Sequence, residues 1–131
     1  MNTLDVVRDS LGRVHELIPA VLDGLTGDDL LWRADPEANS IGWLIWHLTR
    51  IEDDHLAHLG GVEQAWTADG WYQRFGLPYL KHAHGFRMTP VEVGAFNVTD
   101  AHLLAGYSAA TWGQTQAVLA SLVEDRLDDV I

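Results

Sequence analysis

The residue of this 131-residue chain whose type and position most suggest chemistry is His47. It lies between Trp46 and Leu48, in the most apolar part of the stretch NSIGWLIWHLTRIEDDHLAHLGG, residues 39–61. A neutral imidazole in apolar surroundings is a good ligand for zinc, nickel or iron. The same pattern is typical of a core histidine with satisfied hydrogen bonds, so both roles stay open. Zinc takes three or four ligands, and the pattern does not identify the others.

The other histidines carry weaker patterns. His55 and His58 are three residues apart and could chelate a metal, but the acidic residues before them indicate a solvated helix end, where cationic histidine suits the helix dipole. His82 and His84 are two residues apart in an expected loop, a spacing that can bind metal and often has no function. Two more histidines are isolated and are expected in surface or hydrogen-bonded roles: His15 and His102.

No cysteine is present, which excludes disulfides, thiolate metal ligands and a cysteine nucleophile. Any metal must therefore be held by His, Asp, Glu or water, and any thiol chemistry must use the thiol of a small molecule. The sequence also contains no phosphate-binding loop, nucleophile elbow or HExxH motif. No catalytic signature other than the histidine pattern is therefore convincing in the sequence.

The charge balance excludes several partners. The chain has 19 acidic and 8 basic residues, a formal net charge of −11, and such a chain repels phosphate backbones, so no nucleic-acid partner is expected. There is no basic amphipathic face and no apolar run near the ~20 residues that span a bilayer, so no membrane partner is expected. The N-terminus lacks the features of a signal peptide, and a cytoplasmic location is predicted.

Hydrophobic periodicity predicts three long helices that would position these residues, at 2–24, about 40–60 and about 101–123, and no strands. Pro19 is expected to kink or weaken the first of them. An irregular segment from Val62 to Thr99, called the excursion here, separates the second helix from the third. Within it, the turns TADGWYQRF and TPVEVGAF are each expected to open on a threonine cap. An excursion of this length inside a compact domain is usually functional.

The predicted fold class is all-α, in a single domain over residues 1–131. We expect the three long helices to pack antiparallel, one helix short of a closed four-helix bundle. A partner chain or missing sequence could supply the fourth, and the abrupt tail EDRLDDVI favours a C-terminally incomplete domain. Exposed apolar surface on a three-helix unit also predicts a homodimer.

Two separated stretches carry a resemblance to a known family. Residues 23–56 contain NSIG at 39–42, which leads to WHL at 46–48 and then to an acidic run. The later stretch WTADGWYQRFGLP, 66–78, agrees in order with one bacterial branch. Over about 23–120 the chain therefore resembles the DinB-like superfamily, and more narrowly its group of DinB and mycothiol-dependent maleylpyruvate isomerase proteins.

The resemblance implies an up-down-down-up four-helix bundle with a metal site. One histidine of that site comes from the second helix, here His47, and two ligands come from the fourth. The stretch TWGQT, 111–115, has Gly-Gln, but Trp112 stands where a ligand histidine would be, so no ligand is assigned there. The remaining ligands are expected beyond Ile131 in an intact protein, unless the site has been lost. His47 is expected to face the bundle interior without a complete shell of protein ligands.

Two functions follow as hypotheses. The first is a protein that binds a divalent metal (zinc, nickel or iron) and uses mycothiol or bacillithiol in a transfer or isomerisation reaction on a small-molecule electrophile. Here Trp43 and Trp46 would form the pocket wall together with the loop 66–88, since six tryptophans suit either a bulky core or a pocket. The alternative is a non-catalytic helical-bundle dimer in which His47 is a core residue.

Overall fold

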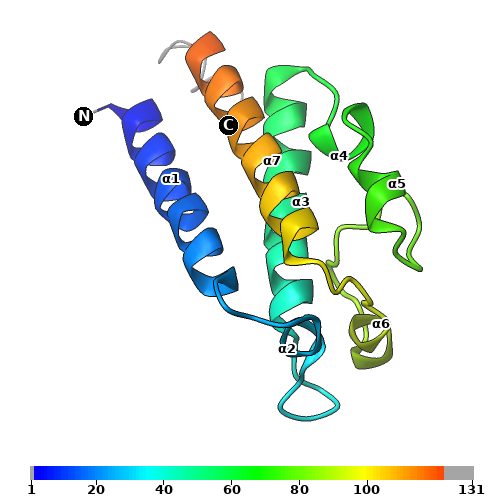
Figure 1. The fold of residues 1–131 in the computed structure, drawn as a ribbon. Coiled ribbons are helices and arrows are strands. Elements are labelled where there is room, and N and C mark those ends of the chain that lie inside the picture. The colour runs from blue at the N-terminus through cyan, green and yellow to red at the C-terminus, as the bar shows by residue number, and fades with distance from the viewer. Residues whose placement is uncertain (1, 123–131) are drawn as a thin grey trace.

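The computed structural model describes residues 2–122, which form helices and no strand (Figure 1). Three helices are long: α1 (Thr3–Leu22), α3 (Ile41–Gly60) and α7 (Ala101–Ser121). Four are short: α2 (Gly27–Leu31), α4 (Ala65–Ala68), α5 (Trp71–Phe75) and α6 (Pro90–Gly94). The predicted all-α class and the three long helices are confirmed. Position 123, the predicted end of the third, lies outside the described residues.

Side-chain caps explain where the long helices begin. Asn2 forms a reciprocal capping box with Asp5, Ser40 accepts the backbone N–H of Trp43, and Asp100 caps α7. The glycine after α3, Gly61, ends that helix in the left-handed conformation, with φ of 65°. These polar caps satisfy amides that would otherwise lack partners at the helix ends.

The first helix continues through Pro19, which lies in its last turn, and Asp23 N–H donates to the Pro19 carbonyl at its end. One local expectation is wrong. Thr67 does not cap a helix, because it lies inside α4, and α5 begins after Gly70 with no side-chain cap. The other expected threonine cap is confirmed, since Thr89 forms a capping box at the start of α6.

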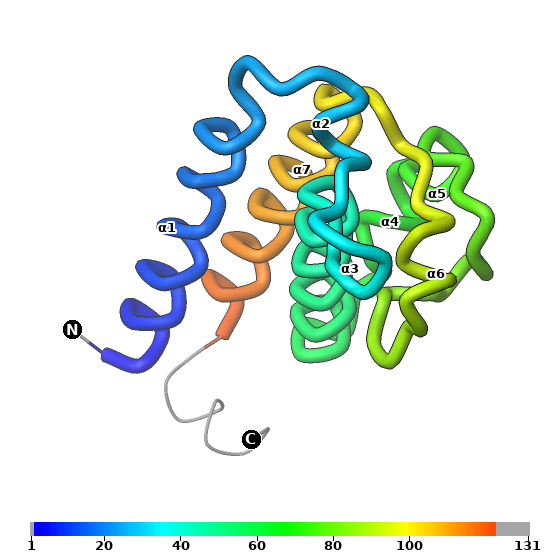
Figure 2. Tube along the Cα trace, turned by 90° about the horizontal axis from the view of Figure 1, so that it is seen from below, coloured from blue at the N-terminus to red at the C-terminus, as the bar shows by residue number. Residues whose placement is uncertain are grey.

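The helix α7 lies between α1 and α3, and α4, α5 and α6 flank α3 on the side away from α1 (Figures 1 and 2). Leucines from the start of α1, the end of α3 and the end of α7 form one cluster, so α3 and α7 run parallel and α1 runs opposite to both. Antiparallel packing of all three long helices is therefore wrong for the α3/α7 pair. The excursion makes this possible, because it returns the chain to the end of the bundle where α3 began. The three long helices of residues 2–122 thus follow an up-down-down order, in agreement with the up-down-down-up order that the family resemblance implies.

A buried polar cluster, defined here as the α1/α3/α7 cluster, joins the three long helices. His15 Nε2–H donates to the Glu52 carboxylate at 2.9 Å, and its Nδ1 is hydrogen-bonded to the hydroxyl of Ser108 at 2.9 Å. Thr115 also donates to Glu52, at 2.6 Å. Trp112 stacks on the imidazole with ring centroids 5.0 Å apart. The hydrogen-bonded role expected for His15 is confirmed.

Away from this cluster, α1 and α3 each pack against α7 more than against one another, which leaves an open groove between them. The α1/α3 groove has a volume of about 330 Å³. Its lining is mainly aliphatic and comprises Leu11, Val14, Leu48, Ile51, Glu52, His55 and Leu56. Large apolar side chains continue this surface along both helices and remain exposed: Val6, Leu17, Val21 and Leu44. This is the apolar surface that the three-helix pattern predicted.

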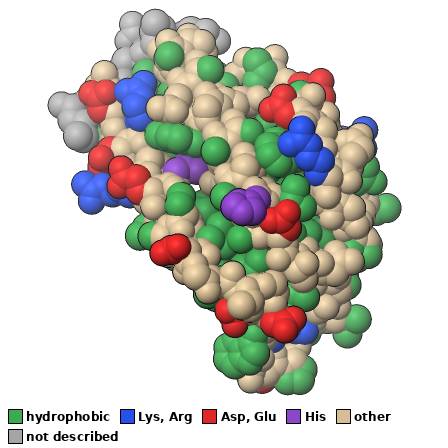
Figure 3. Space-filling view, viewed as in Figure 1, with side chains coloured by type: hydrophobic (Ala, Val, Ile, Leu, Met, Phe, Trp, Pro, Cys, Tyr) green, Lys and Arg blue, Asp and Glu red, His purple; other side chains and the backbone are tan. Residues whose placement is uncertain are grey.

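The described residues contain no helix that is long and apolar enough to cross a membrane. On the face shown in Figure 3, hydrophobic side chains gather toward the centre and most charged side chains lie nearer the edges.

Two buried threonines one turn apart on α7 test the polar cluster. Thr115→Val removes a hydrogen bond to a carboxylate and is expected to lower the free energy of unfolding by about 1.5–3 kcal/mol. Thr111 is as buried, but its hydroxyl has no hydrogen-bond partner within the described residues. Thr111→Val should therefore change stability by less than about 0.5 kcal/mol or raise it. Urea denaturation measures both, and equal losses would show that the Thr115–Glu52 bond has no particular role.

Candidate functional site

Three side chains on one side of α3 contact a single segment of the excursion, residues 82–88. Trp43, His47 and Arg50 are four and three residues apart, a spacing that places them in line along a helix. Trp43 contacts Met88, and His47 contacts the carbonyl of residue 84. Arg50, the last of the three along α3, contacts the carbonyls of residues 83 and 82. The 82–88 segment therefore runs antiparallel to α3, and His47 lies in the middle of the contact.

The hydrogen bond of His47 determines which ring nitrogen is free. Its Nδ1 lies 2.5 Å from the carbonyl oxygen of His84, and a carbonyl can only accept, so Nδ1 carries the hydrogen. In the neutral ring the lone pair is then on Nε2, which has no hydrogen-bond partner among residues 2–122. Trp43 stacks on the half-buried ring with centroids 4.7 Å apart. This arrangement leaves one nitrogen of His47 able to bind a ligand.

Gly85 allows the segment to come this close. Its φ is +95°, in the left-handed region, and a Cβ built on it would lie 2.5 Å from His47 Nδ1 and 2.9 Å from Trp43 Cζ2. Real Cβ atoms do not approach other atoms so closely. Any larger residue would have to push the segment away from α3.

Arg50 anchors the next part of the segment, although it is fully buried. Its Nε–H donates to the carbonyl of Ala83 at 3.0 Å, and Nη2 to that of His82 at 3.4 Å. Nη1 donates to Gln64 Oε1 at 2.6 Å and to the hydroxyl of Tyr107 at 3.4 Å. The guanidinium thus joins α3 to the excursion at two places and to α7.

Asp53 balances this buried charge. Its Oδ2 lies 3.9 Å from Arg50 Nη1, and its side chain is 0% exposed. The carboxylate accepts the backbone N–H groups of Ala65 and Trp66 at the start of α4, at 2.9 and 2.8 Å, and the hydroxyl of Tyr107 at 2.6 Å. Burial and the neighbouring Asp53 raise the pKa of Tyr107 far above its ordinary value, so the phenol stays protonated and donates.

The structure brings only one of the two proposed pocket-wall tryptophans to His47. Trp43 stacks on the ring, whereas Trp46 is 1% exposed and packs among Trp66, Tyr79 and Phe96. The polar contacts of His47 come from the 82–88 segment and its ring contact from Trp43, rather than from α1 or α7. His47 therefore faces the excursion on the covered side of α3, and the contacts given for it do not bear out the expectation that it faces the other two long helices.

The remaining histidines are placed apart from His47. His58 and His82 line a cavity of about 340 Å³ together with Asp54 and Glu63, so one member of each histidine pair reaches the same place. Within residues 2–122, no three His, Asp or Glu side chains are grouped so that they could hold a metal ion. Two others have separate roles: His55 lines the α1/α3 groove, and His84 contributes its carbonyl to His47.

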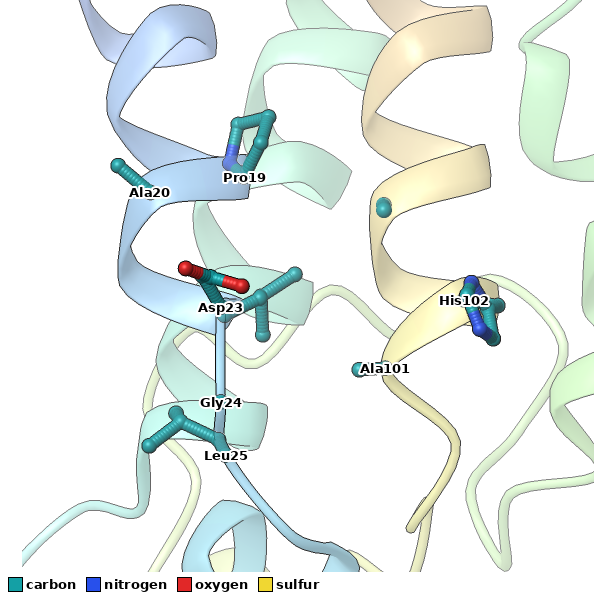
Figure 4. Close-up of a pocket in the computed structure, with 9 residues that line it drawn as sticks. Pro19, Ala20, Asp23, Gly24, Leu25, Ala101 and His102 are labelled. Atoms are coloured by element: carbon teal, nitrogen blue, oxygen red, sulfur yellow. The ribbon is translucent and has the colours of Figure 1, made fainter.

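A further cavity of about 600 Å³ lies between the end of α1 and the start of α7 (Figure 4). Small and apolar residues form most of its lining, and Asp23 and His102 supply the polar groups. His102 is exposed, as the sequence predicted. None of the predicted site residues lines this cavity.

Sequence reasoning missed Arg50, Asp53, Tyr107 and Gly85. The signal for the first two was available, since an arginine and an aspartate three residues apart interrupt the apolar pattern of 41–60. Nothing in the local sequence indicates that Tyr107 reaches Asp53, or that Gly85 faces His47, because both contacts join distant parts of the chain.

The buried charge pair can be tested with adjacent aspartates. Asp53→Asn leaves Arg50 buried without its counter-charge and should lower the free energy of unfolding by about 3–5 kcal/mol. Asp54→Asn is the control, because Asp54 is only partly buried and its one hydrogen bond, from Gln64, can still be accepted by the new amide oxygen. It should cost less than about 1 kcal/mol. Thermal denaturation showing similar losses for both variants would contradict the assigned role of Asp53.

Comparisons with known proteins agree with this fold. A family model for the DinB superfamily matches residues 10–131. A solved structure, the crystal structure of the conserved protein of locus from Enterococcus faecalis, is similar with a TM-score of 0.86 and 26% sequence identity. The match covers 95% of this chain and 74% of that one. No curated protein matches. The resemblance seen in the sequence is thereby confirmed, and the chain belongs to the DinB superfamily.

Proposed function

We propose that this protein binds a divalent metal ion (zinc, nickel or iron) through Nε2 of His47. The observation that carries the proposal is the hydrogen bond from Nδ1–H to the His84 carbonyl. In metal sites, ligating histidines commonly donate their other ring N–H to a carbonyl or carboxylate, which fixes the tautomer and the ring orientation. The stacked Trp43 ring restricts the imidazole further. His47 therefore has the local environment of a ligand as well as the position that the family resemblance implies.

The described residues supply one ligand of such a metal site. His47 supplies one nitrogen, and the described residues add no second His, Asp or Glu to it. The proposal takes the other donors from water, from a thiol ligand or from polypeptide outside residues 2–122. A chain without cysteine is compatible with a sulfur ligand that comes from a small molecule.

We propose further that the thiol is a low-molecular-weight one, such as mycothiol or bacillithiol, used in transfer to or isomerisation of a small electrophile. A divalent ion supplies the acidity that converts a bound thiol to a thiolate near neutral pH. This chain's residues orient and shield the site: Trp43 covers one face of His47, and the 82–88 segment excludes water from Nδ1. Arg50 is held away from the imidazole by its own carbonyl partners.

Replacing His47 tests the metal proposal. Metal analysis of the purified protein and calorimetric titration with Ni²⁺ and Zn²⁺ should show binding that His47→Ala weakens at least about 10-fold. His58→Ala is the matched control, because His58 is an exposed histidine of the same helix and should leave the affinity unchanged. Equal affinity of the wild type and His47→Ala, or a loss confined to His58→Ala, would contradict the proposal.

The open α1/α3 groove favours a second role, assembly. We propose that a second copy of the chain covers this groove, since aliphatic side chains on both helices face it and others beside it stay exposed. In the non-catalytic alternative this assembly is the whole function and His47 is structural. Either way, the proposal predicts a two-fold dimer in which each α1 covers the partner's groove.

A charge placed beside the groove tests the dimer. Leu17 is 61% exposed, so Leu17→Glu should leave the fold intact but shift the protein from dimer to monomer in sedimentation equilibrium. Leu80→Glu is the control, because Leu80 is 87% exposed and lies in the excursion, away from the groove. A wild type that is monomeric at all concentrations, or a dimer that Leu17→Glu leaves intact, would refute the second-copy arrangement.

A further inference from the structure

Three successive anchors hold the 82–88 segment against α3. Trp43 Nε1–H points to the sulfur of Met88 at 3.4 Å at one end, and Arg50 holds the other end. Two tight turns shape the chain here. Ala83 N–H donates to the carbonyl of Leu80, just before the segment, and Met88 N–H donates to the carbonyl of Gly85. The carbonyls of residues 82, 83 and 84 are thereby left to face α3, where the donors are on Arg50 and His47.

We infer that the 82–88 segment, which Arg50 holds and Gly85 allows to come close, positions His47. By holding the carbonyls of His82 and Ala83, the Arg50 guanidinium places the next carbonyl, that of His84, on Nδ1–H of His47. The segment then fixes the tautomer in which Nε2 carries the lone pair. The link to metal affinity rests on the proposed function, whereas the link to the tautomer stands on the metal-free protein alone.

Arginine suits this task because its donors are fixed in one plane. Nε and Nη2 reach two consecutive carbonyls, while Nη1 is held by Gln64 and Tyr107. A lysine has one ammonium group on a flexible stem and cannot reproduce this set of bonds. Asp53 keeps the buried guanidinium in place, so the register of the segment is determined from the interior of the protein.

Gly85 gives the same inference an independent basis. It follows His84 directly, and only a residue without Cβ allows the backbone to approach His47 and Trp43 as closely as it does. A methyl group at this position should lift the His84 carbonyl from His47 while leaving Arg50 and Asp53 unchanged. Without that acceptor, both tautomers of the neutral imidazole become available.

The test is the tautomer of His47 in metal-free, full-chain protein with ¹⁵N-labelled histidine. Long-range ¹H–¹⁵N correlation spectra distinguish the two tautomers, at about pH 8.5, roughly two units above the ordinary histidine pKa of about 6.5. His47→Gln assigns the signal by its loss. The wild type should show hydrogen on Nδ1, whereas Arg50→Lys and Gly85→Ala should both show a mixture with the Nε2–H form. Because Arg50→Lys also disturbs a buried charge pair and can impair folding, Gly85→Ala carries the test if that variant is not folded.

Gly76→Ala is the matched control for the glycine variant. Gly76 also lies in the excursion with positive φ, +56°, but the nearest atom to a built Cβ is 3.9 Å away and belongs to Gln73. Gly76→Ala should lose a similar amount of stability from alanine at positive φ, and it should leave the His47 tautomer unchanged. Wild-type His47 with hydrogen on Nε2, or equal tautomer changes in Gly76→Ala and Gly85→Ala, would overturn the inference.

A Ni²⁺ titration of the same variants distinguishes failure of this inference from failure of the proposed function. Ni²⁺ titration of Gly85→Ala should give an affinity about 10-fold weaker than that of Gly76→Ala, the lower end of what second partners of ligating histidines contribute. If the tautomer changes as expected and the wild type binds no Ni²⁺, the positioning role of the 82–88 segment stands and the proposed metal function fails. If Ni²⁺ binds and the tautomer is the same in all variants, the positioning role fails and the metal function stands.

Discussion

The buried pair of Arg50 and Asp53 is the constraint on which the arrangement of the excursion depends. A charge taken out of water is costly unless all of its hydrogen-bonding capacity is used. Each partner of this pair therefore requires contacts from elsewhere in the chain. Asp53 takes the first amides of α4 and the hydroxyl of Tyr107 on α7, and Arg50 takes the carbonyls of the 82–88 segment. One turn of α3 thus determines where the chain goes after it leaves that helix.

The α1/α3/α7 cluster plays the corresponding role for the long helices. Glu52 stands next to Asp53 in the sequence, but its side chain points toward α1 and α7, where His15 and Thr115 satisfy it. Neighbouring acids on α3 therefore serve two different interfaces, one with the excursion and one with the other long helices. Both clusters favour one register of α7 against α3, because Tyr107 and Thr115 must reach their own acids together. Apolar packing alone would discriminate less between registers.

The sequence predicts the three long helices, but it does not predict the contacts that the buried charges and His47 make with distant residues. Hydrophobic periodicity locates the long helices to within about two residues, because helix formation depends on local pattern. The parallel course of α3 and α7 follows only from the up-down-down-up order that the family resemblance implies, because local pattern does not show how residues 62–99 cross the bundle. His47 was recognisable from its apolar neighbours and from WHL at 46–48. Its actual partners, Gly85 and the carbonyl of His84, are about forty residues away and carry no local sign of the contact.

The proposed metal site requires that the fold present Nε2 of His47 to the ion while the excursion holds Nδ1. The most direct measurement is a crystal structure of the Ni²⁺-loaded protein with anomalous diffraction at the nickel absorption edge. An anomalous peak is expected within coordination distance of His47 Nε2, with the hydrogen bond from Nδ1 to the His84 carbonyl retained. A peak on Nδ1, or one bound by His58 and His82 with His47 free, would contradict the proposed site.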